Sequence, residues 1–133
     1  MEQTNEAIPL AKERHGCVTT WLILIIIVNS LTSLLYIFAG DLVAENLTNG
    51  ISDQMLTVLA LLSIANVIFA ILIFRWKKIG FWGFVITSLL AMIINLNIGL
   101  GIFQSLIGLL GIAIAYGVLQ ISKDNVSAWE NLE

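Results

Sequence analysis

Residues 55–97 read MLTVLALLSIANVIFAILIFRWKKIGFWGFVITSLLAMIINLN, and this stretch decides the fold. It contains two apolar runs, Met55–Phe74 and Ile79–Leu96, which only the basic sequence RWKK at 75–78 separates. Neither run holds an Asp, Glu, Lys, Arg or His, and each approaches the ~20 residues with which a helix crosses a bilayer core. Because so short a link joins them, we expect two antiparallel membrane-spanning helices that pack side by side.

Two further charge-free apolar runs flank this pair, Cys17–Ala39 before it and Ile98–Ile121 after it. Charged residues make up 11% of the 133 residues, against about 25% in soluble proteins, and hydrophobic residues make up 59%. The polar pieces between and beyond the runs are too short to bury a core of their own. The sequence therefore predicts an all-α fold with a single transmembrane domain over 1–133. This domain is an antiparallel four-transmembrane-helix bundle with spans at about 17–39, 55–74, 79–96 and 98–121.

The basic residues all fall on one side of such a bundle: before the first span, between the second and third, and after the fourth. The loops on the other side carry only acidic charges, at Asp41, Glu45 and Asp53. Because Lys and Arg near the spans mark the cytoplasmic side, we expect both chain ends to be cytoplasmic. The six basic residues are Lys12, Arg14, Arg75, Lys77, Lys78 and Lys123.

Local signals predict what happens at the ends of the spans. Ser52 or Asp53 is placed to cap the second span. Ser127 and Glu130 have the spacing of a capping box, which predicts a short helix on the cytoplasmic membrane surface. A docking motif for a soluble partner is the alternative interpretation of that helix. The tryptophans near this side are interpreted as headgroup anchors: Trp21, Trp76, Trp82 and Trp129.

Uncharged polar side chains recur near the middle of the spans. An amide or hydroxyl in hydrocarbon is costly unless it is hydrogen-bonded, so we expect these groups to face the bundle interior and bond one another. Two interpretations stay open: interhelical hydrogen bonds that hold the bundle, or a small hydrated cavity that binds or conducts an uncharged polar solute. The polar layer comprises Asn29, Asn66, Thr87, Ser88 and, about one turn nearer the outside, Gln104.

The fourth span carries small and polar residues in alternating steps of four and three, which keeps them on one stripe. Small residues let helix backbones approach closely in lipid, so this stripe is the candidate helix-packing seam. Its partner is either the third span, which has small or polar residues every four positions from Gly83 to Asn95, or the fourth span of another chain. The seam comprises Asn97, Gly101, Gln104, Gly108, Gly111 and Ala115.

Recognisable catalytic motifs are missing from the sequence. It has no HExxH, G-x-S-x-G or Walker motif, one histidine (His15) and one cysteine (Cys17). The spans carry no charged side chain, which argues against proton coupling, voltage sensing and transport of charged substrates. A net charge of −3 argues against nucleic acid as a partner. We therefore expect no enzyme activity, no cofactor and no metal. The expected function is helix packing in the lipid bilayer, as a homo-oligomer or with another membrane protein as an accessory subunit. The alternative is a channel or facilitator for a small uncharged solute.

Three parts of the chain carry a resemblance. The basic turn FRWKKIGFW at 74–82, the glycine-rich run at 98–121 and the polar tail SAWENL at 127–132 resemble a broad group of small four-span bacterial inner-membrane proteins. The resemblance implies a multi-pass protein of the bacterial inner (cytoplasmic) membrane. It implies no particular activity, and no functional residue is assigned from it.

Overall fold

The computed structural model describes residues 12–47, 50–99 and 101–133, apart from the side chain of Gln104. Four long helices dominate it: α1 (Gly16–Phe38), α3 (Asp53–Phe74), α4 (Lys78–Asn97) and α5 (Gly101–Leu119). The short helix α2 (Gly40–Glu45) follows α1. After α5 come the strands β1 (Ser122–Lys123) and β2 (Val126–Ser127) and the short helix α6 (Ala128–Asn131).

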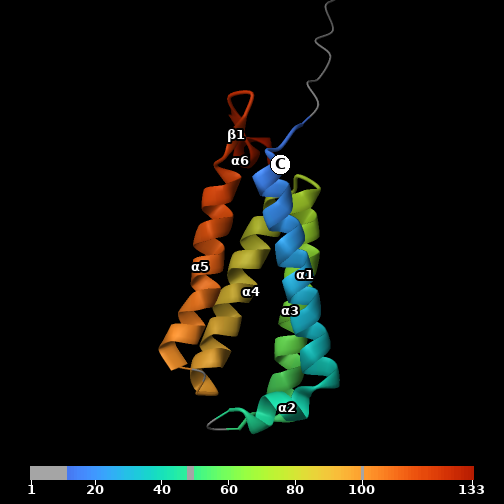
Figure 1. Cartoon of the computed structure of the whole chain (residues 1–133), viewed down its shortest axis with the longest axis vertical. Coiled ribbons are helices and arrows are strands. Elements are labelled where there is room, and N and C mark those ends of the chain that lie inside the picture. The colour runs from blue at the N-terminus through green and yellow to red at the C-terminus, as the bar shows by residue number, and fades with distance from the viewer. Residues whose placement is uncertain (1–11, 48–49, 100) are drawn as a thin grey trace, which may run out of the picture.

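The four long helices form the all-α antiparallel bundle that the sequence predicts. Each packs against the next along the chain: α1 against α3, α3 against α4, and α4 against α5. The helices α1 and α5 make far fewer contacts with each other, so the bundle is least closed on the side between them. In Figure 1 the pair α4 and α5 lies to the left and the pair α1 and α3 to the right.

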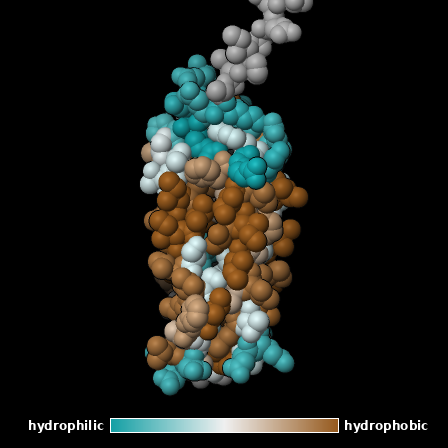
Figure 2. All heavy atoms as spheres, turned by 90° about the vertical axis from the view of Figure 1, so that its right-hand side faces the viewer, coloured by the Kyte–Doolittle hydropathy of each residue, from teal (hydrophilic) through white to brown (hydrophobic). Residues whose placement is uncertain are grey.

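The surface of the bundle is apolar over its middle and polar at both ends. Figure 2 shows a broad hydrophobic belt between two hydrophilic caps. Large apolar side chains are exposed within the belt, Leu31 by 61% and Phe103 by 86%. All four long helices are long and apolar enough to cross a membrane. Such a belt matches the hydrocarbon core of a bilayer, and the belt side chains therefore contact lipid.

The fourth spanning helix is shorter than predicted at both ends. The predicted span at 98–121 becomes α5 at Gly101–Leu119. Ile98 is instead the C-cap of α4, which ends at Asn97. Both Gly99 and Gly101 have a φ of +78°. A left-handed backbone conformation interrupts a right-handed helix, and glycine adopts it without steric cost. The other three helices begin and end within two residues of their predicted spans.

Two glycines of α4 lie very close to α3. A Cβ atom on Gly80 would lie 2.5 Å from the carbonyl oxygen of Phe69, and one on Gly83 would lie 2.3 Å from the Phe69 ring. Only glycine fits at position 80, because a Cβ there would overlap the backbone of α3, whereas a Cβ at position 83 would require the Phe69 ring to move. The small stripe of the third span therefore packs against α3 at Gly83, and Gly80 extends this contact toward the basic turn.

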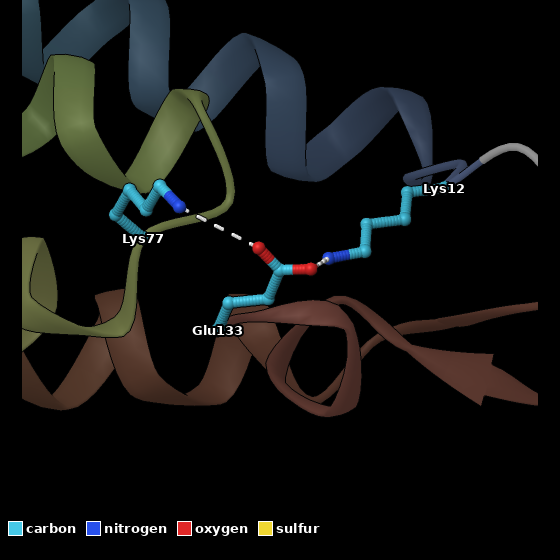
Figure 3. A network of polar contacts seen from close by, with 3 residues as sticks. All are labelled: Lys12, Lys77 and Glu133. Atoms are coloured by element: carbon cyan, nitrogen blue, oxygen red, sulfur yellow. Dashed lines mark hydrogen bonds and ion pairs between the residues drawn. The ribbon is translucent and has the colours of Figure 1, made fainter.

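The chain segments at one end of the bundle are tied together. We call this the basic end, because it carries all six basic residues. The backbone N–H of Lys78 donates to the carbonyl of Glu133 (2.7 Å), and the N–H of Glu133 donates to the carbonyl of Trp76 (2.8 Å). The Glu133 carboxylate pairs with Lys12 (2.5 Å) and Lys77 (3.5 Å), as Figure 3 shows. These contacts join the N-terminal segment, the α3–α4 turn and the C-terminal segment.

The segment after α5 contains a hairpin that the sequence analysis missed. Its two-residue loop is Asp124 and Asn125, whose φ angles are +54° and +66°. A type I′ turn needs positive φ at both positions, and Asp and Asn tolerate this better than most residues. The predicted capping box is present: Ser127 accepts from the Glu130 N–H, and the Glu130 carboxylate accepts from the Ser127 N–H (2.7 Å). The hairpin and its cap direct α6 back against the bundle.

Arg14 fastens the N-terminal segment to the end of α3. Its guanidinium donates to the carbonyl of Phe74 (2.5 Å) and lies 4.0 Å from the centre of the Trp76 ring. A cation beside the last carbonyls of a helix is favoured by the helix dipole, and its stacking on an aromatic face adds to this. Partial burial lowers the pKa of Arg14 from its ordinary value. The residue stays charged, since the ordinary value for arginine lies far above neutral.

Candidate functional site

Three residues of the predicted polar layer meet in the middle of the bundle. The Asn66 side-chain N–H of α3 donates to the Asn29 Oδ1 of α1 (3.3 Å). The Thr87 hydroxyl of α4 donates to the Asn66 Oδ1, and it also lies 3.0 Å from the carbonyl oxygen of Gly83. Asn66 and Thr87 are buried, with exposures of 8% and 7%. One amide, Asn66, thus connects three helices.

The other two members of the layer are placed differently. Ser88 is buried beside Thr87 and lines a cleft described below. The side chain of Gln104 lies outside the described part of the chain. Asn29 also donates to the carbonyl of Ile25 one turn earlier (2.9 Å), so its amide is held by its own helix as well.

A cleft of about 290 Å³ opens on the poorly closed side of the bundle, between α1 and α5. We call it the α1–α5 cleft. All four long helices contribute to its lining, which combines apolar side chains with six polar ones. Ligand sites in proteins have this character: an apolar wall with a few polar groups that fix the orientation of the bound molecule. The polar lining residues are Trp21, Asn29, Asn66, Ser88, Asn95 and Ser105.

Two of these lining residues carry buried polar atoms that need a partner. Within the described residues, the indole Nε1 of Trp21 and the Oδ1 of Asn95 are the buried side-chain atoms that have no hydrogen-bond partner in the chain. From the sequence, Trp21 is interpreted as a headgroup anchor and Asn95 as part of a packing stripe, whereas in the structure both line the cleft. The one feature of the sequence that could have indicated the cleft is that both residues carry a polar group within an apolar helix.

The candidate seam of the fourth span lies partly along this cleft. Gly108 and Gly111 line it, and a Cβ atom added to either would meet nothing within 4 Å. Gly101 and Asn97 are exposed at the far end of the bundle, opposite the basic end, whereas Ala115 is buried. Inside one chain the glycines of the seam are therefore not in close helix contact. Packing of this seam against another chain stays a prediction.

Ser105 is the polar lining residue that the sequence analysis did not single out. It is buried to 2% exposure, and its hydroxyl donates to the carbonyl of Gly101 (2.9 Å). Groups that could bind a metal through three or more His, Cys, Asp or Glu side chains are not found over the described ranges. The cleft offers hydrogen-bonding groups without charge.

Comparison of the chain with protein-family models, with curated proteins and with solved structures finds no match. The bundle itself therefore indicates which class of protein this chain belongs to. Four apolar helices pack against one another, each long enough to span a membrane. The face seen in Figure 2 carries a broad hydrophobic belt, and all four helices expose large apolar side chains. The chain is a multi-pass integral membrane protein.

Proposed function

We propose that this protein is a non-catalytic membrane subunit that assembles with another transmembrane chain. The partner is a second copy in a homo-oligomer or a different membrane protein that this chain accompanies. The single observation that carries the proposal is the open side between α1 and α5, where the glycines of α5 are left uncovered.

Helices in lipid are held together by other interactions than helices in water. Burying Leu or Ile against another helix gains little, because lipid tails are equally apolar. Association instead depends on close backbone contact at small residues and on hydrogen bonds. At Gly80 and Gly83 this contact is made within the chain. At Gly108 and Gly111 an added Cβ would meet none of the described residues within 4 Å, so a helix of a second chain is the partner that this small surface fits.

Photo-crosslinking from the rim of the cleft tests the proposal. In a Cys17→Ser background, Val28→Cys places a thiol on the cleft lining, and Ile27→Cys places one on the neighbouring position outside it. The two residues have nearly equal exposure, 51% and 50%, so they are matched controls for reactivity. Each thiol receives a short photo-reactive group in native membranes.

We expect Val28→Cys to give a discrete crosslinked band and Ile27→Cys to give only lipid adducts. Mass spectrometry of the band identifies the partner as this chain or another one. Equal, diffuse crosslinking from both positions would contradict the proposal, because it would mean that lipid alone covers the cleft.

A further inference from the structure

The polar groups of the α1–α5 cleft are distributed along its length. At 1.5 Å per residue, their positions can be counted from the helix ends that meet at the basic end of the bundle. Successive groups are then separated by no more than about 5 Å in depth, from about 8 Å to about 26 Å below the basic end. In this order they are Trp21, Asn66, Ser88, Asn29, Ser105 and Asn95.

The two ends of this row differ in what they need. Trp21 offers an N–H donor and Asn95 offers a carbonyl acceptor, and neither has a partner elsewhere in the described chain. None of the described residues that line the cleft carries a charge. An ion would have no counter-charge here, and a hydrocarbon chain would leave both polar atoms unbonded. Whatever fills the cleft must therefore be uncharged, with an acceptor at the Trp21 end and a donor at the Asn95 end.

The size of the cleft limits the occupant further. About 290 Å³ corresponds to the liquid volume of about ten water molecules. A helix of ~10 Å diameter running over the same ~18 Å would need roughly 1,400 Å³. A partner helix can cover the cleft from the lipid side but cannot lie within it. The interior is left for small molecules.

The basic end of the cleft is closed by apolar packing. Val18, Leu22 and Phe81 are buried in one cluster with Ile73 and Leu119. By the same count four of these positions lie between the basic end and Trp21, and Leu22 lies one residue beyond Trp21, at about 9 Å. The residues after α5 add Ala128 and Leu132 to this cluster. The row of polar groups therefore ends at Trp21 and does not continue through the bundle.

We propose that the α1–α5 cleft is a blind binding site for a small uncharged molecule that both donates and accepts hydrogen bonds, the chemical class of glycerol and urea. The molecule accepts from the Trp21 indole at the inner end, and water continues the row of hydrogen bonds from it to the Asn95 carbonyl at the outer end. The site binds its ligand and does not conduct it. This inference needs no partner chain.

The indole N–H signals of the full chain in lipid nanodiscs test this site. The protein is labelled with ¹⁵N at its tryptophans, the Trp21 signal is assigned with Trp21→Phe, and glycerol is titrated in. We expect a saturable shift of the Trp21 signal and no comparable shift of Trp82, which is 55% exposed on the outer surface.

Variants at the outer end separate a site from a general solvent effect. Asn95→Leu removes the outer end of the hydrogen-bonded row and should weaken glycerol binding by up to about five-fold, the factor that one ordinary hydrogen bond supplies. Asn97→Leu, an exposed amide two residues away and outside the lining, should leave the affinity unchanged. If Asn95→Leu does not fold, Gly108→Leu fills the open space of the cleft and should abolish the shift.

Three results would overturn the proposal. The first is a Trp21 signal that contacts water but does not respond to glycerol, which would mean a site for water only. The second is an equal effect of Asn95→Leu and Asn97→Leu. The third is protein-dependent glycerol flux into liposomes that Asn66→Leu removes, which would show that the cleft conducts. Crosslinking at Val28 enters none of these measurements, so the proposed assembly and the proposed site fail separately.

Discussion

Replacing Asn66 with Leu removes the amide that connects three helices. The substitution deletes the hydrogen bond to Asn29 of α1 and the one from Thr87 of α4. Interhelical hydrogen bonds in membranes are worth about 0.6 kcal/mol on average and up to about 1.7 kcal/mol. Two of them give an expected loss of roughly 1–3 kcal/mol in the free energy of unfolding.

The structure also predicts how the neighbours of Asn66 respond. The Thr87 hydroxyl keeps an acceptor on its own helix, the carbonyl of Gly83 at 3.0 Å. The Asn29 amide keeps its donor bond to the carbonyl of Ile25, and Asn29 itself lines the cleft. Neither group is stranded, so the loss stays within the range of two hydrogen bonds. Asn29→Leu breaks one interhelical bond and should cost about half as much.

Reversible unfolding in mixed detergent micelles measures these differences. Asn97→Leu is the control, because Asn97 is exposed and its side-chain amide, among the described residues, bonds the carbonyl of Ile93 on its own helix. A double-mutant cycle of Asn66→Leu with Thr87→Val should give a coupling energy of about 0.5 kcal/mol or more. If Asn66→Leu is as mild as Asn97→Leu and the coupling is zero, the hydrogen-bonded layer does not hold the bundle.

Three further predictions concern other parts of the fold. Gly80→Ala should destabilise the bundle, since its Cβ would lie 2.5 Å from backbone on α3, whereas Gly108→Ala meets open space and should be neutral or stabilising by up to about 1 kcal/mol in detergent unfolding. Trp76 has a φ of +67° at the end of α3, so Trp76→Gly should be less destabilising than Trp76→Ala by about 1 kcal/mol, because glycine relieves the strain while both lose the contact with Arg14. The nearby Lys12 and Lys77 hold the pKa of Glu133 below its ordinary value of 4.5, so the pairing is complete above that value and should be lost as the pH falls below it. An NMR titration of the Glu133 carboxyl measures this pKa, which should rise toward 4.5 in Lys12→Gln while Lys77 still lowers it.

The spanning helices could be predicted because the predicted spans contain no charge, whereas two of the three connections between them do. The charges at Arg75, Lys77 and Lys78 mark the α3–α4 turn clearly. The α4–α5 turn has no charge, and its position depends on the left-handed conformation of Gly99 and Gly101, which an apolar run does not reveal. The fourth span was therefore predicted too long.

The polar layer and the packing contacts differ in what the sequence reveals. Asn29, Asn66 and Thr87 could be singled out because an amide or hydroxyl in hydrocarbon needs a partner. Gly80 was missed because its need for glycine depends on the position of Phe69 on another helix. The cleft depends on the wide spacing of α1 and α5, which no local pattern in either helix encodes. Trp21 and Asn95 could not be brought together without that spacing.

Assembly through the open side of the bundle is the central claim, and native mass spectrometry of complexes released directly from membranes tests it most directly. The chain alone has a mass of 14.6 kDa. We predict a wild-type complex of larger mass, made of further copies or of this chain with a partner. Gly111→Leu, which fills the uncovered face of α5, should release the folded single chain, whereas Leu110→Ala, on the neighbouring exposed position, should keep the complex. A wild-type protein that is released only at 14.6 kDa, or a Gly111→Leu complex of unchanged mass, would contradict the account.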